Sequence, residues 1–431
     1  MKKLYFVFIF LFLGIISYSQ PFNRAKMDSL FDYLSAKNLA IGGIAISDNG
    51  KIIYQRSFGK DQTPETEYRI GSISKMFTAV IIFQLIEEKK LFADDTLSEF
   101  FPQLPNAGKI TIGNMLRHRS GLANFTNNTN YDIWKDQPKT HEELLAMIAS
   151  QKPDFQPNAK SDYNNSNYLL LSYIIEKICK KPYKEVVTER VIKKINLKQT
   201  YYGDHAGFQG PEAISYKYFD NQWKMDRAAF LDNFSGAGAI ISTPADMCRF
   251  IGAIFNYKLV NKSSVDQMKN FIDGYGMGMF PYGSDAHPGF GHNGKTEGFA
   301  SSLSYYPDKK LTIAYCTNGE VYPKAQILDD VFNICFNLPC NIPTFKIISL
   351  DESVLDKYTG AYSSDGIGMQ VICKKEGKKL VLETRGQVFS LDALSANQFI
   401  NVQYGFFFDF NNDGKQLLIK DVDDVYELNK K

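Results

Sequence analysis

The chain has 431 residues, of which 44% are hydrophobic and 22% charged, and its formal net charge at neutral pH is +2. This length is too great for one ordinary hydrophobic core and predicts two domains. Positive and negative residues are mixed along the sequence, without the basic stripe that binds nucleic acid or the polybasic cluster that binds anionic lipid. We therefore expect no nucleic-acid partner and no stable insertion into a membrane.

The N-terminal segment predicts export. A basic start at residues 1–3 precedes an apolar run over residues 4–16 and then small residues two apart. This order is typical of a secretory signal peptide, and the apolar run is short for a membrane span. We expect cleavage after Ser19 and a periplasmic or secreted protein; the alternative is a retained membrane anchor.

The hydrophobic pattern predicts both helices and strands before residue 340. Apolar residues recur at helical spacing in several segments, and strand-like alternation surrounds the turn signal Asp48-Asn49-Gly50. Thr243 can cap a further helix, with Pro244 in its first turn. The expected elements are helices over residues 24–37, 73–90, 165–179 and 324–337, a hairpin over 40–58, mainly helices and loops over 111–260, and strands over 300–306 and 311–317.

The pattern changes after residue 340. Residues 341–349 predict a linker, and short strand-like runs then alternate with turns. Strands at both ends of the first region, with helices between them, predict a mixed α/β domain whose sheet pairs the two ends. The expected organisation is a signal peptide over residues 1–19, the α/β domain over 20–340, the linker, and a small antiparallel β domain over 350–431.

Cysteine and histidine spacings do not predict a metal site. The six cysteines form no Cys-x-x-Cys pair, and the five histidines form no His-Glu-x-x-His motif. We expect no metal and no cofactor. Export permits disulfides, and Cys335 and Cys340 are near enough in the sequence to pair; the sequence leaves this open.

Ser72 and Lys75 stand where the helix over 73–90 should begin. Residues at i and i+3 share a helix face, so hydroxyl and amine would meet and could form an acyl-transfer nucleophile. About one or two Ser-x-x-Lys matches arise by chance in a chain of this length. The other match, Ser57 and Lys60, falls in the predicted hairpin, where i and i+3 face opposite ways, and is discarded. Ser72 could also be a plain helix cap.

Two further motifs could complete such a site. Tyr163 and Asn165 lie in a polar loop before an apolar helix, where Asn165 could bond both Lys75 and a substrate carbonyl. Each could instead be structural, as a packing aromatic and a helix cap. His292 and Gly294 lie in a glycine-rich segment that a substrate backbone could approach, or that could be a turn with an exposed histidine.

The general base stays open at this point. Lys75 would need a pKa lowered by roughly three units, about 4 kcal/mol, to act near pH 7. Burial at a helix N-terminus works in that direction. Alternatively, Lys75 stays charged and lowers the pKa of Tyr163, which is then the base. A weaker motif of small residues, 235–239, could allow close backbone approach or mark only a turn.

The order of these motifs resembles the β-lactamase-related serine hydrolases, the family of class C β-lactamases, D-alanyl-D-alanine carboxypeptidases, D-amino peptidases and some esterases. The resemblance covers roughly residues 30–335. It implies an antiparallel sheet flanked by helices, with an all-helical subdomain, in front of the small β domain. The matching segments are residues 69–79 (nucleophile), 115–122 (Leu-Leu-x-His-x-Ser-Gly-Leu), 163–176 (Tyr-x-Asn), 242–250 (Ser-Thr-x-x-Asp-Met) and 291–299 (Gly-His-x-Gly).

The resemblance also implies roles for single residues. Ser72 would be acylated, and Lys75 and Tyr163 would shuttle its proton. Backbone N–H groups of Ser72 and Lys295 would form the oxyanion hole, and His292 and Gly294 would line the site from an edge strand. The residues implied to bind substrate are Asn165, His292, Gly294 and Lys295.

The implied function is an exported serine hydrolase with a small-molecule or peptide substrate. Class C β-lactamases usually carry Lys-Thr-Gly at the third motif, where this chain has His292-Asn293-Gly294. That difference resembles the carboxypeptidase and esterase branches more than dedicated β-lactamases. We rank D-alanyl peptide hydrolysis slightly above ester hydrolysis, and both above β-lactam hydrolysis. A catalytically silent protein that binds peptides or wall fragments is the other alternative, although the intact Lys75, Tyr163 and Asn165 argue against it.

Overall fold

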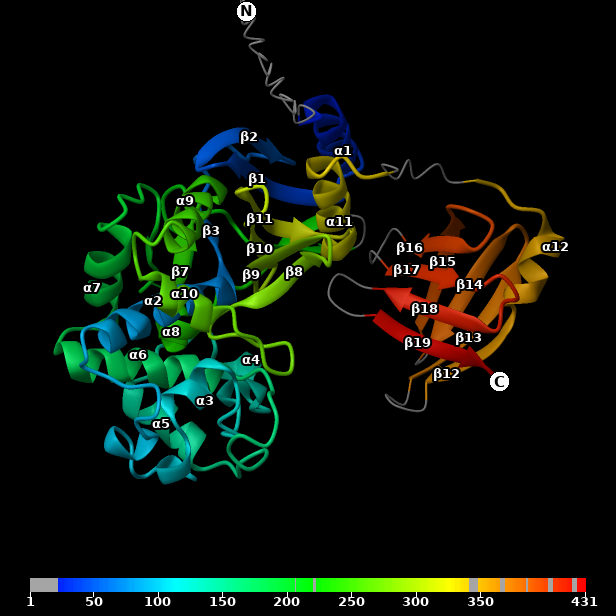
Figure 1. Cartoon of the computed structure of the whole chain (residues 1–431). Coiled ribbons are helices and arrows are strands. Elements are labelled where there is room, and N and C mark those ends of the chain that lie inside the picture. Colours follow the sequence, from blue (N-terminus) through cyan, green and yellow to red (C-terminus); the bar gives the residue numbers. More distant parts are fainter. Residues whose placement is uncertain are drawn as a thin grey trace, which may run out of the picture.

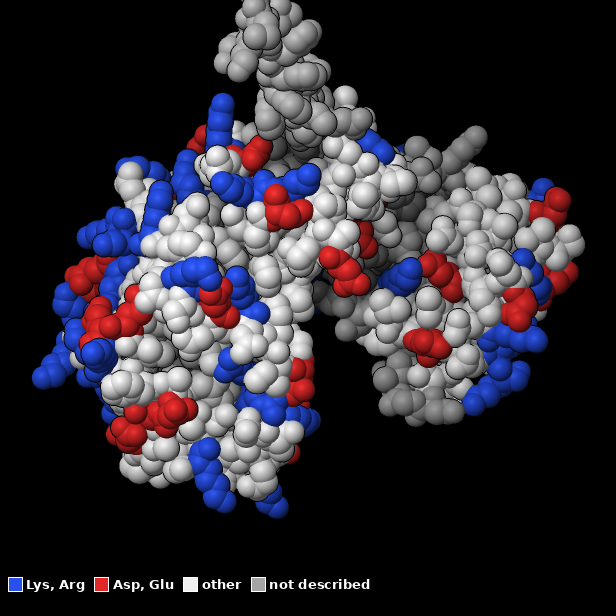
Figure 2. All heavy atoms as spheres, viewed as in Figure 1, with Lys and Arg blue, Asp and Glu red and all other residues white. Residues whose placement is uncertain are grey.

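The computed structural model describes residues 22–205, 207–219, 222–340, 348–364, 369–384, 387–401, 406–420 and 425–431. Figure 1 shows a part built from a sheet and helices and a part built mainly from strands. The predicted signal peptide lies outside the described residues, as does most of the predicted linker. Figure 2 shows acidic and basic side chains interspersed on the face in view, as the mixed charge of the sequence predicts.

A six-stranded antiparallel sheet organises the first part, in the order β2-β1-β11-β10-β9-β8. The predicted hairpin forms, and β1 pairs with β11, with Ile44 opposite Tyr315. The sheet thus joins the two ends of this part of the chain, as expected from the sequence. Its strands are β1 (Ala40–Asp48), β2 (Lys51–Phe58), β8 (Phe280–Ser284), β9 (His287–Thr296), β10 (Phe299–Tyr306) and β11 (Leu311–Glu320).

Strand β9 corrects one expectation, because it carries His292 and Gly294 but is not the edge of the sheet. Strand β8 pairs with its outer side, and Phe280 lies opposite Gly291. Both strands contain proline and glycine, which weaken strand propensity and hide the alternation that the sequence analysis relied on.

Helices cover both faces of the sheet. Helices α1 (Arg24–Ala36) and α11 (Lys324–Cys335) pack with Ile44 and Ile46 in one hydrophobic core. The opposite face, reached by Ala45, packs against helix α9 (Pro244–Phe255), which Thr243 caps as predicted. Because both faces are covered, the first eight residues of β1 are all buried.

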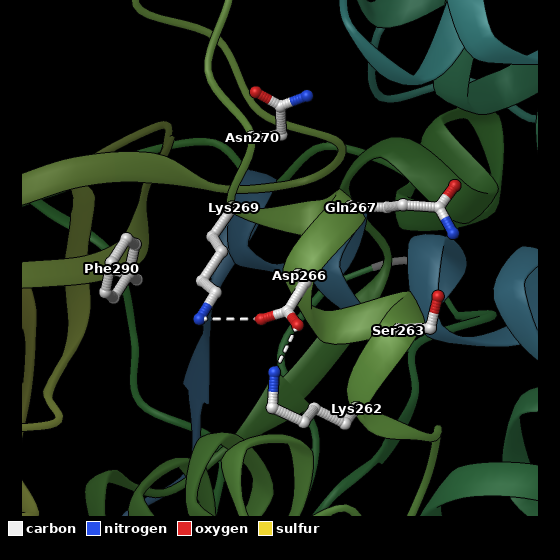
Figure 3. A pocket seen from close by; sticks show the side chains of 7 residues that line it. All are labelled: Lys262, Ser263, Asp266, Gln267, Lys269, Asn270 and Phe290. Atoms are coloured by element: carbon white, nitrogen blue, oxygen red, sulfur yellow. Dashed lines mark hydrogen bonds and ion pairs between the residues drawn. The ribbon is translucent and has the colours of Figure 1, made fainter.

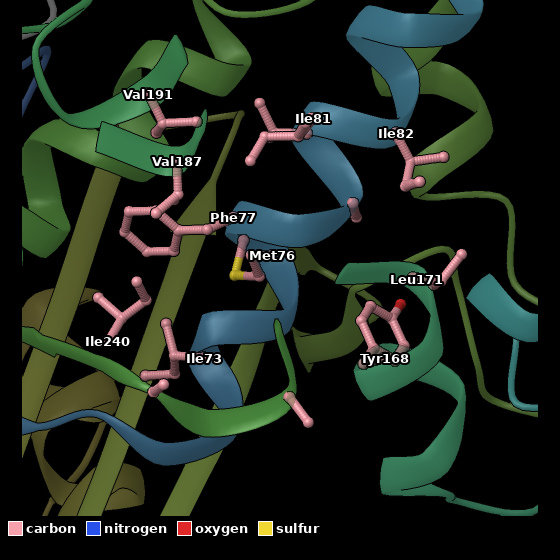
Figure 4. Close-up of a cluster of buried hydrophobic side chains, with 14 of the residues drawn as sticks. Ile73, Met76, Phe77, Ile81, Ile82, Tyr168, Leu171, Val187, Val191 and Ile240 are labelled. Carbon is pink, nitrogen blue, oxygen red and sulfur yellow. The ribbon is translucent and has the colours of Figure 1, made fainter. Parts of the chain in front are cut away.

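Helix α2 (Ser74–Glu87) runs through the middle of the larger core. Its residues from Ser74 to Phe83 are buried, which explains why the predicted helix over 73–90 is largely apolar. The Phe77 and Phe250 rings stack with centroids 3.7 Å apart. Figure 4 shows Phe77 among Val187, Val191 and Ile240.

Below the sheet in Figure 1 lies the expected region of mainly helices and loops. Helix α6 has the predicted bounds. Short strands β3 (Tyr68–Arg69), β7 (Ile240–Ser242) and β4 (Tyr201–Tyr202) form a three-stranded sheet, and β5 (Tyr216–Phe219) and β6 (Gln222–Met225) form a hairpin. The helices are α3 (Ile112–Leu116), α4 (Tyr131–Trp134), α5 (His141–Ala149), α6 (Asn165–Cys179), α7 (Tyr183–Val187), α8 (Ser235–Gly238) and α10 (Lys262–Met268).

The C-terminal part is a closed antiparallel barrel with its own hydrophobic core. Helix α12 (Glu352–Leu355) precedes it. The Tyr322 ring meets Phe407 of the barrel at 5.2 Å between centroids. The barrel strands are β12 (Gly360–Ser364), β13 (Met369–Glu376), β14 (Lys379–Thr384), β15 (Gln387–Ala393), β16 (Gln398–Asn401), β17 (Phe406–Phe410), β18 (Gln416–Lys420) and β19 (Val425–Lys430).

The six cysteines are free thiols, so the pairing left open by the sequence does not form. Cys340 instead donates a hydrogen bond to Asp330, with 3.4 Å between Sγ and Oδ1. No helix among the described residues has both the length and the apolar character that a membrane span needs.

Truncating Phe77 should destabilise the first part of the chain. Phe77→Ala leaves a cavity between α2 and α9 and should lower the free energy of unfolding by about 3–5 kcal/mol. Urea unfolding followed by near-UV circular dichroism measures this loss. Phe92→Ala is the matched control, since the Phe92 side chain is 55% exposed and its loss should cost little. Equal losses in both variants would contradict the role given to the core around α2.

Candidate active site

Ser72 lies in a 3-10 turn (Gly71–Ile73) that leads into α2. Gly71 has a positive φ of 50°, and a Cβ there would come within 2.8 Å of the backbone nitrogen of Lys295. On the other side of this contact, a Cβ at Gly294 would lie 2.0 Å from the Ile70 carbonyl oxygen. Both positions require glycine, because the turn and strand β9 lie backbone to backbone.

Lys75 is completely buried one helical turn after Ser72. Its Nζ lies 2.9 Å from Ser72 Oγ, 2.7 Å from Asn165 Oδ1 and 2.8 Å from the carbonyl oxygen of Ala237. Burial holds the pKa of Lys75 well below its ordinary value. In its neutral form, the amine can donate to Asn165 and Ala237 and accept the hydroxyl proton of Ser72.

Tyr163 is partly buried beside this pair, with its ring centroid 4.9 Å from Lys75 Nζ. Burial raises the pKa of Tyr163, and a hydrogen bond with Ser72 only partly opposes that shift. The phenol is therefore neutral at physiological pH. The sequence left both Lys75 and Tyr163 open as the general base. The lowered pKa of Lys75 and the raised pKa of Tyr163 favour Lys75.

Asn165 is the first residue of α6, but it is not the helix cap. Asn164 takes that role, since its side chain accepts the N–H of Ser166 at 2.7 Å. The Asn165 amide is thereby free to bridge, accepting from Lys75 through Oδ1 and donating to Thr126 Oγ1 through Nδ2 at 2.9 Å.

His292 is buried in β9 rather than exposed in a turn. Its ring lies 4.6 Å from that of Phe280 and 6.3 Å from that of Tyr163, between centroids. Burial and the nearby charge of Lys75 lower the pKa of His292 to about 3. It is therefore a neutral group at neutral pH and cannot replace the positive charge of a lysine.

His118 belongs to the segment 115–122 that resembles a family motif, and its ring packs against Tyr163. The two ring centroids are 4.5 Å apart. Its Nδ1 accepts the backbone N–H of Asn164 at 3.0 Å, and burial lowers its pKa. His118 thus fixes the start of α6 as a neutral ring.

The structure also brings in residues that the sequence did not assign. Helix α8, from the weak small-residue motif, presents the Ala237 carbonyl to Lys75. Gly236 allows this approach, because a Cβ there would lie 2.8 Å from Thr78 Oγ1. Thr126 and Tyr131 come from loop and short-helix segments without a distinctive pattern, and only their place in the fold identifies them.

A cavity of about 240 Å³ opens at Ser72. Lys75, Tyr163 and His292 do not line it and lie behind Ser72 and Asn165. The lining residues are Gly71, Ser72, Thr126, Tyr131, Asn165, Phe234, Ala237, Gly238, Lys295 and Thr296. A larger hollow of about 760 Å³, shown in Figure 3, lies beside α10, where Asp266 pairs with Lys262 and Lys269, and shares no residue with this cavity.

The described part of the chain contains no group of three or more His, Cys, Asp or Glu side chains that could hold a metal ion. The seven predicted site residues, in contrast, do come together: Lys75, Tyr163 and Asn165 surround Ser72, while His292, Gly294 and Lys295 share β9.

Comparison with known proteins gives a family match and several relatives. The family model described as Beta-lactamase matches residues 27–333. Penicillin-binding protein 4* of Bacillus subtilis is 26% identical over 85% of this chain and 88% of its own length. Teichoic acid D-alanine hydrolase of Staphylococcus aureus is 28% identical over 67% of this chain and 72% of its own.

A solved structure resembles nearly the whole chain. The octameric penicillin-binding protein homologue from Pyrococcus abyssi aligns with a TM-score of 0.64 and 21% identity. The alignment covers 95% of this chain and all of that one, so the similarity of fold includes the C-terminal barrel.

The lowered pKa of Lys75 and the raised pKa of Tyr163 predict how catalysis depends on pH. If neutral Lys75 is the base, kcat/KM should rise as the pH rises through its lowered pKa. In Tyr163→Phe this rise should stay at the same pH while the plateau falls, because burial and not the phenol sets the pKa of Lys75. Profiles of kcat/KM against pH for both proteins test this. Loss of the rise in Tyr163→Phe would make Tyr163 the base.

Proposed function

The chain belongs to the beta-lactamase family as a serine hydrolase, and we propose that it is an exported enzyme that cleaves D-alanyl peptides through an acyl-enzyme on Ser72. The observation that carries the proposal is the buried amine of Lys75, held 2.9 Å from the Ser72 hydroxyl with its pKa lowered. A desolvated lysine beside a serine is an arrangement that activates the hydroxyl for attack on a carbonyl.

Acylation begins with transfer of the Ser72 proton to Lys75 as Oγ attacks the substrate carbonyl carbon. Asn165 Oδ1 and the Ala237 carbonyl then accept hydrogen bonds from the ammonium that forms. Tyr163, a neutral phenol beside Ser72, passes a proton to the leaving amine and is reprotonated from Lys75. Water then attacks the acyl carbon and gives a proton to Lys75. The bond between Ser72 Oγ and the acyl group breaks, the acid leaves, and Lys75 returns the proton to Ser72 Oγ.

The oxyanion of the tetrahedral intermediate would bind the backbone N–H groups of Ser72 and Lys295. The close approach of Gly71 to the Lys295 backbone nitrogen supports this pair of donors. It holds the turn with Ser72 and strand β9 together at the mouth of one cavity. Removing one such donor typically lowers kcat by about 10²–10³-fold.

The third motif and the small cavity support a D-alanyl substrate. His292 is neutral and so lacks the charge of the lysine that class C β-lactamases usually carry at this position, which agrees with the sequence comparison of this motif. The cavity at Ser72 is small, which suits an acyl group with a methyl side chain. D-Alanine is also the group named for the Staphylococcus aureus relative. Export is supported by the order of basic, apolar and small residues over 1–19.

Covalent labelling tests the nucleophile. A fluorophosphonate probe or a labelled penicillin should add its mass to the wild-type protein, and peptide mass spectrometry should find it on Ser72. Ser72→Ala should remain unlabelled, whereas Ser57→Ala should label fully, because Ser57 belongs to the Ser-x-x-Lys match in strand β2. Equal labelling of Ser72→Ala and wild type would remove Ser72 from the chemistry.

A substrate panel tests the acyl group. We expect kcat/KM to be highest for D-alanyl-D-alanine peptides, lower for p-nitrophenyl esters and lowest for nitrocefin. Peptides with L-alanine are the matched control for stereochemistry and should be cleaved poorly. Highest activity on esters, without preference between D- and L-alanine, would make the protein a carboxylesterase. Turnover of none of these substrates, with thermal stabilisation by the peptides, would indicate the silent binding protein.

A further inference from the structure

A second cavity, of about 510 Å³, lies at the end of strand β11 and beneath the β5–β6 hairpin. It shares no lining residue with the cavity at Ser72. Its size falls in the range of small-molecule sites. The residues that decide its chemistry are Asn38, Lys60, Asp61, Tyr216, Trp223 and Asn318.

Asn318 gives this cavity an unused hydrogen-bond acceptor. The side chain is completely buried, and its Nδ2 donates to the Ile214 carbonyl at 2.7 Å. That bond fixes the amide orientation and leaves Oδ1 without a partner among the described residues. A buried acceptor is costly when unpaired, and Asn318 lines the cavity, so a ligand donor that reaches this atom would satisfy it.

The hairpin adds an aromatic wall in a fixed position. Trp223 Nε1 donates to Asn38 Oδ1 at 2.9 Å. The indole lies directly on Gly319, where a Cβ would come within 2.8 Å of the ring. Trp223 is only partly buried, and Tyr216 lines the same cavity from the neighbouring strand.

The charges around the cavity cancel. Lys60 and Asp61 lie 3.7 Å apart as an exposed ion pair. The third charged lining residue, Glu212, is fully buried and paired with Arg69. Balanced charge disfavours an anionic or cationic ligand, whereas an aromatic face with amide groups suits a ring that has C–H groups on its faces and hydroxyl or amide groups at its edge.

We propose that this cavity is a binding site for a neutral sugar unit, with the ring stacked on Trp223 and a hydroxyl or acetamido N–H donating to Asn318 Oδ1. The site stands apart from the chemistry at Ser72 and does not require it. Its position is nevertheless adjacent: Thr296 lines the catalytic cavity, and Gly298 in the same β9–β10 turn donates its N–H to Ser215 Oγ, next to Tyr216. A substrate that carries a sugar could therefore be held on both sides of this turn.

Calorimetric titration of the full-length Ser72→Ala protein tests the site without turnover. N,N′-diacetylchitobiose should bind with a Kd of about 1 mM, and cellobiose, which lacks the acetamido groups, more weakly. Trp223→Ala and Asn318→Ala, made in the Ser72→Ala background, should each weaken binding at least about tenfold, the loss expected for one stacking contact or one hydrogen bond. Thermal melting of each variant confirms that it is folded.

Met225→Ala is the matched control on the same hairpin. The Met225 side chain is 70% exposed and does not line the cavity, so binding should be unchanged. Absence of sugar binding in the folded Ser72→Ala protein overturns the proposal, as does binding that survives both Trp223→Ala and Asn318→Ala. Because hydrolysis plays no part in the titration, failure of the sugar site and failure of the proposed hydrolase remain separate results.

Discussion

The burial of one amine is the constraint around which the first part of this protein is arranged. Lys75 sits in a core where an ammonium is poorly solvated, and its nitrogen is satisfied by groups from three separate elements: the turn before α2, the start of α6 and the short helix α8. Each element must arrive in the right place for the nitrogen to be bonded at all. The same burial that makes Lys75 costly to the fold lowers its pKa and makes its neutral form accessible beside the Ser72 hydroxyl.

Two histidine rings near Lys75 show the same effect of burial on basic groups. His118 and His292 both have lowered pKa values, and the charge of Lys75 contributes to both shifts. Three basic groups packed together and shielded from water cannot all be protonated. Two neutral histidine rings therefore pack around Tyr163, and the amine of Lys75 is the basic group that lies beside the Ser72 hydroxyl.

Side-chain patterns predicted the helices and the motif residues well, because both depend on local spacing. The apolar run of α2 and the bounds of α6 followed from periodicity, and the order of Ser72, Tyr163 and His292 pointed to one site. What the sequence could not provide rests on backbone atoms and long-range contacts. The Ala237 carbonyl that bonds Lys75 has no side-chain signature, and β8 and β9 are rich in glycine and proline. The partnerless amide oxygen of Asn318 likewise exists only in the folded chain.

The pairing of β1 with β11 also governs when this enzyme can become active. Residue 44 must find residue 315 before the central sheet is complete, and the turn that carries Ser72 rests on Lys295. Contacts between such distant parts of a chain form late, since the entropy of closing the intervening loop must be paid first. A chain that emerges from the ribosome or a translocation channel from its N-terminus thus carries its serine and lysine early, but as an unassembled pair. The pairing of β1 with β11 is completed only when nearly three quarters of the polypeptide has emerged, so synthesis is separated in time from hydrolysis.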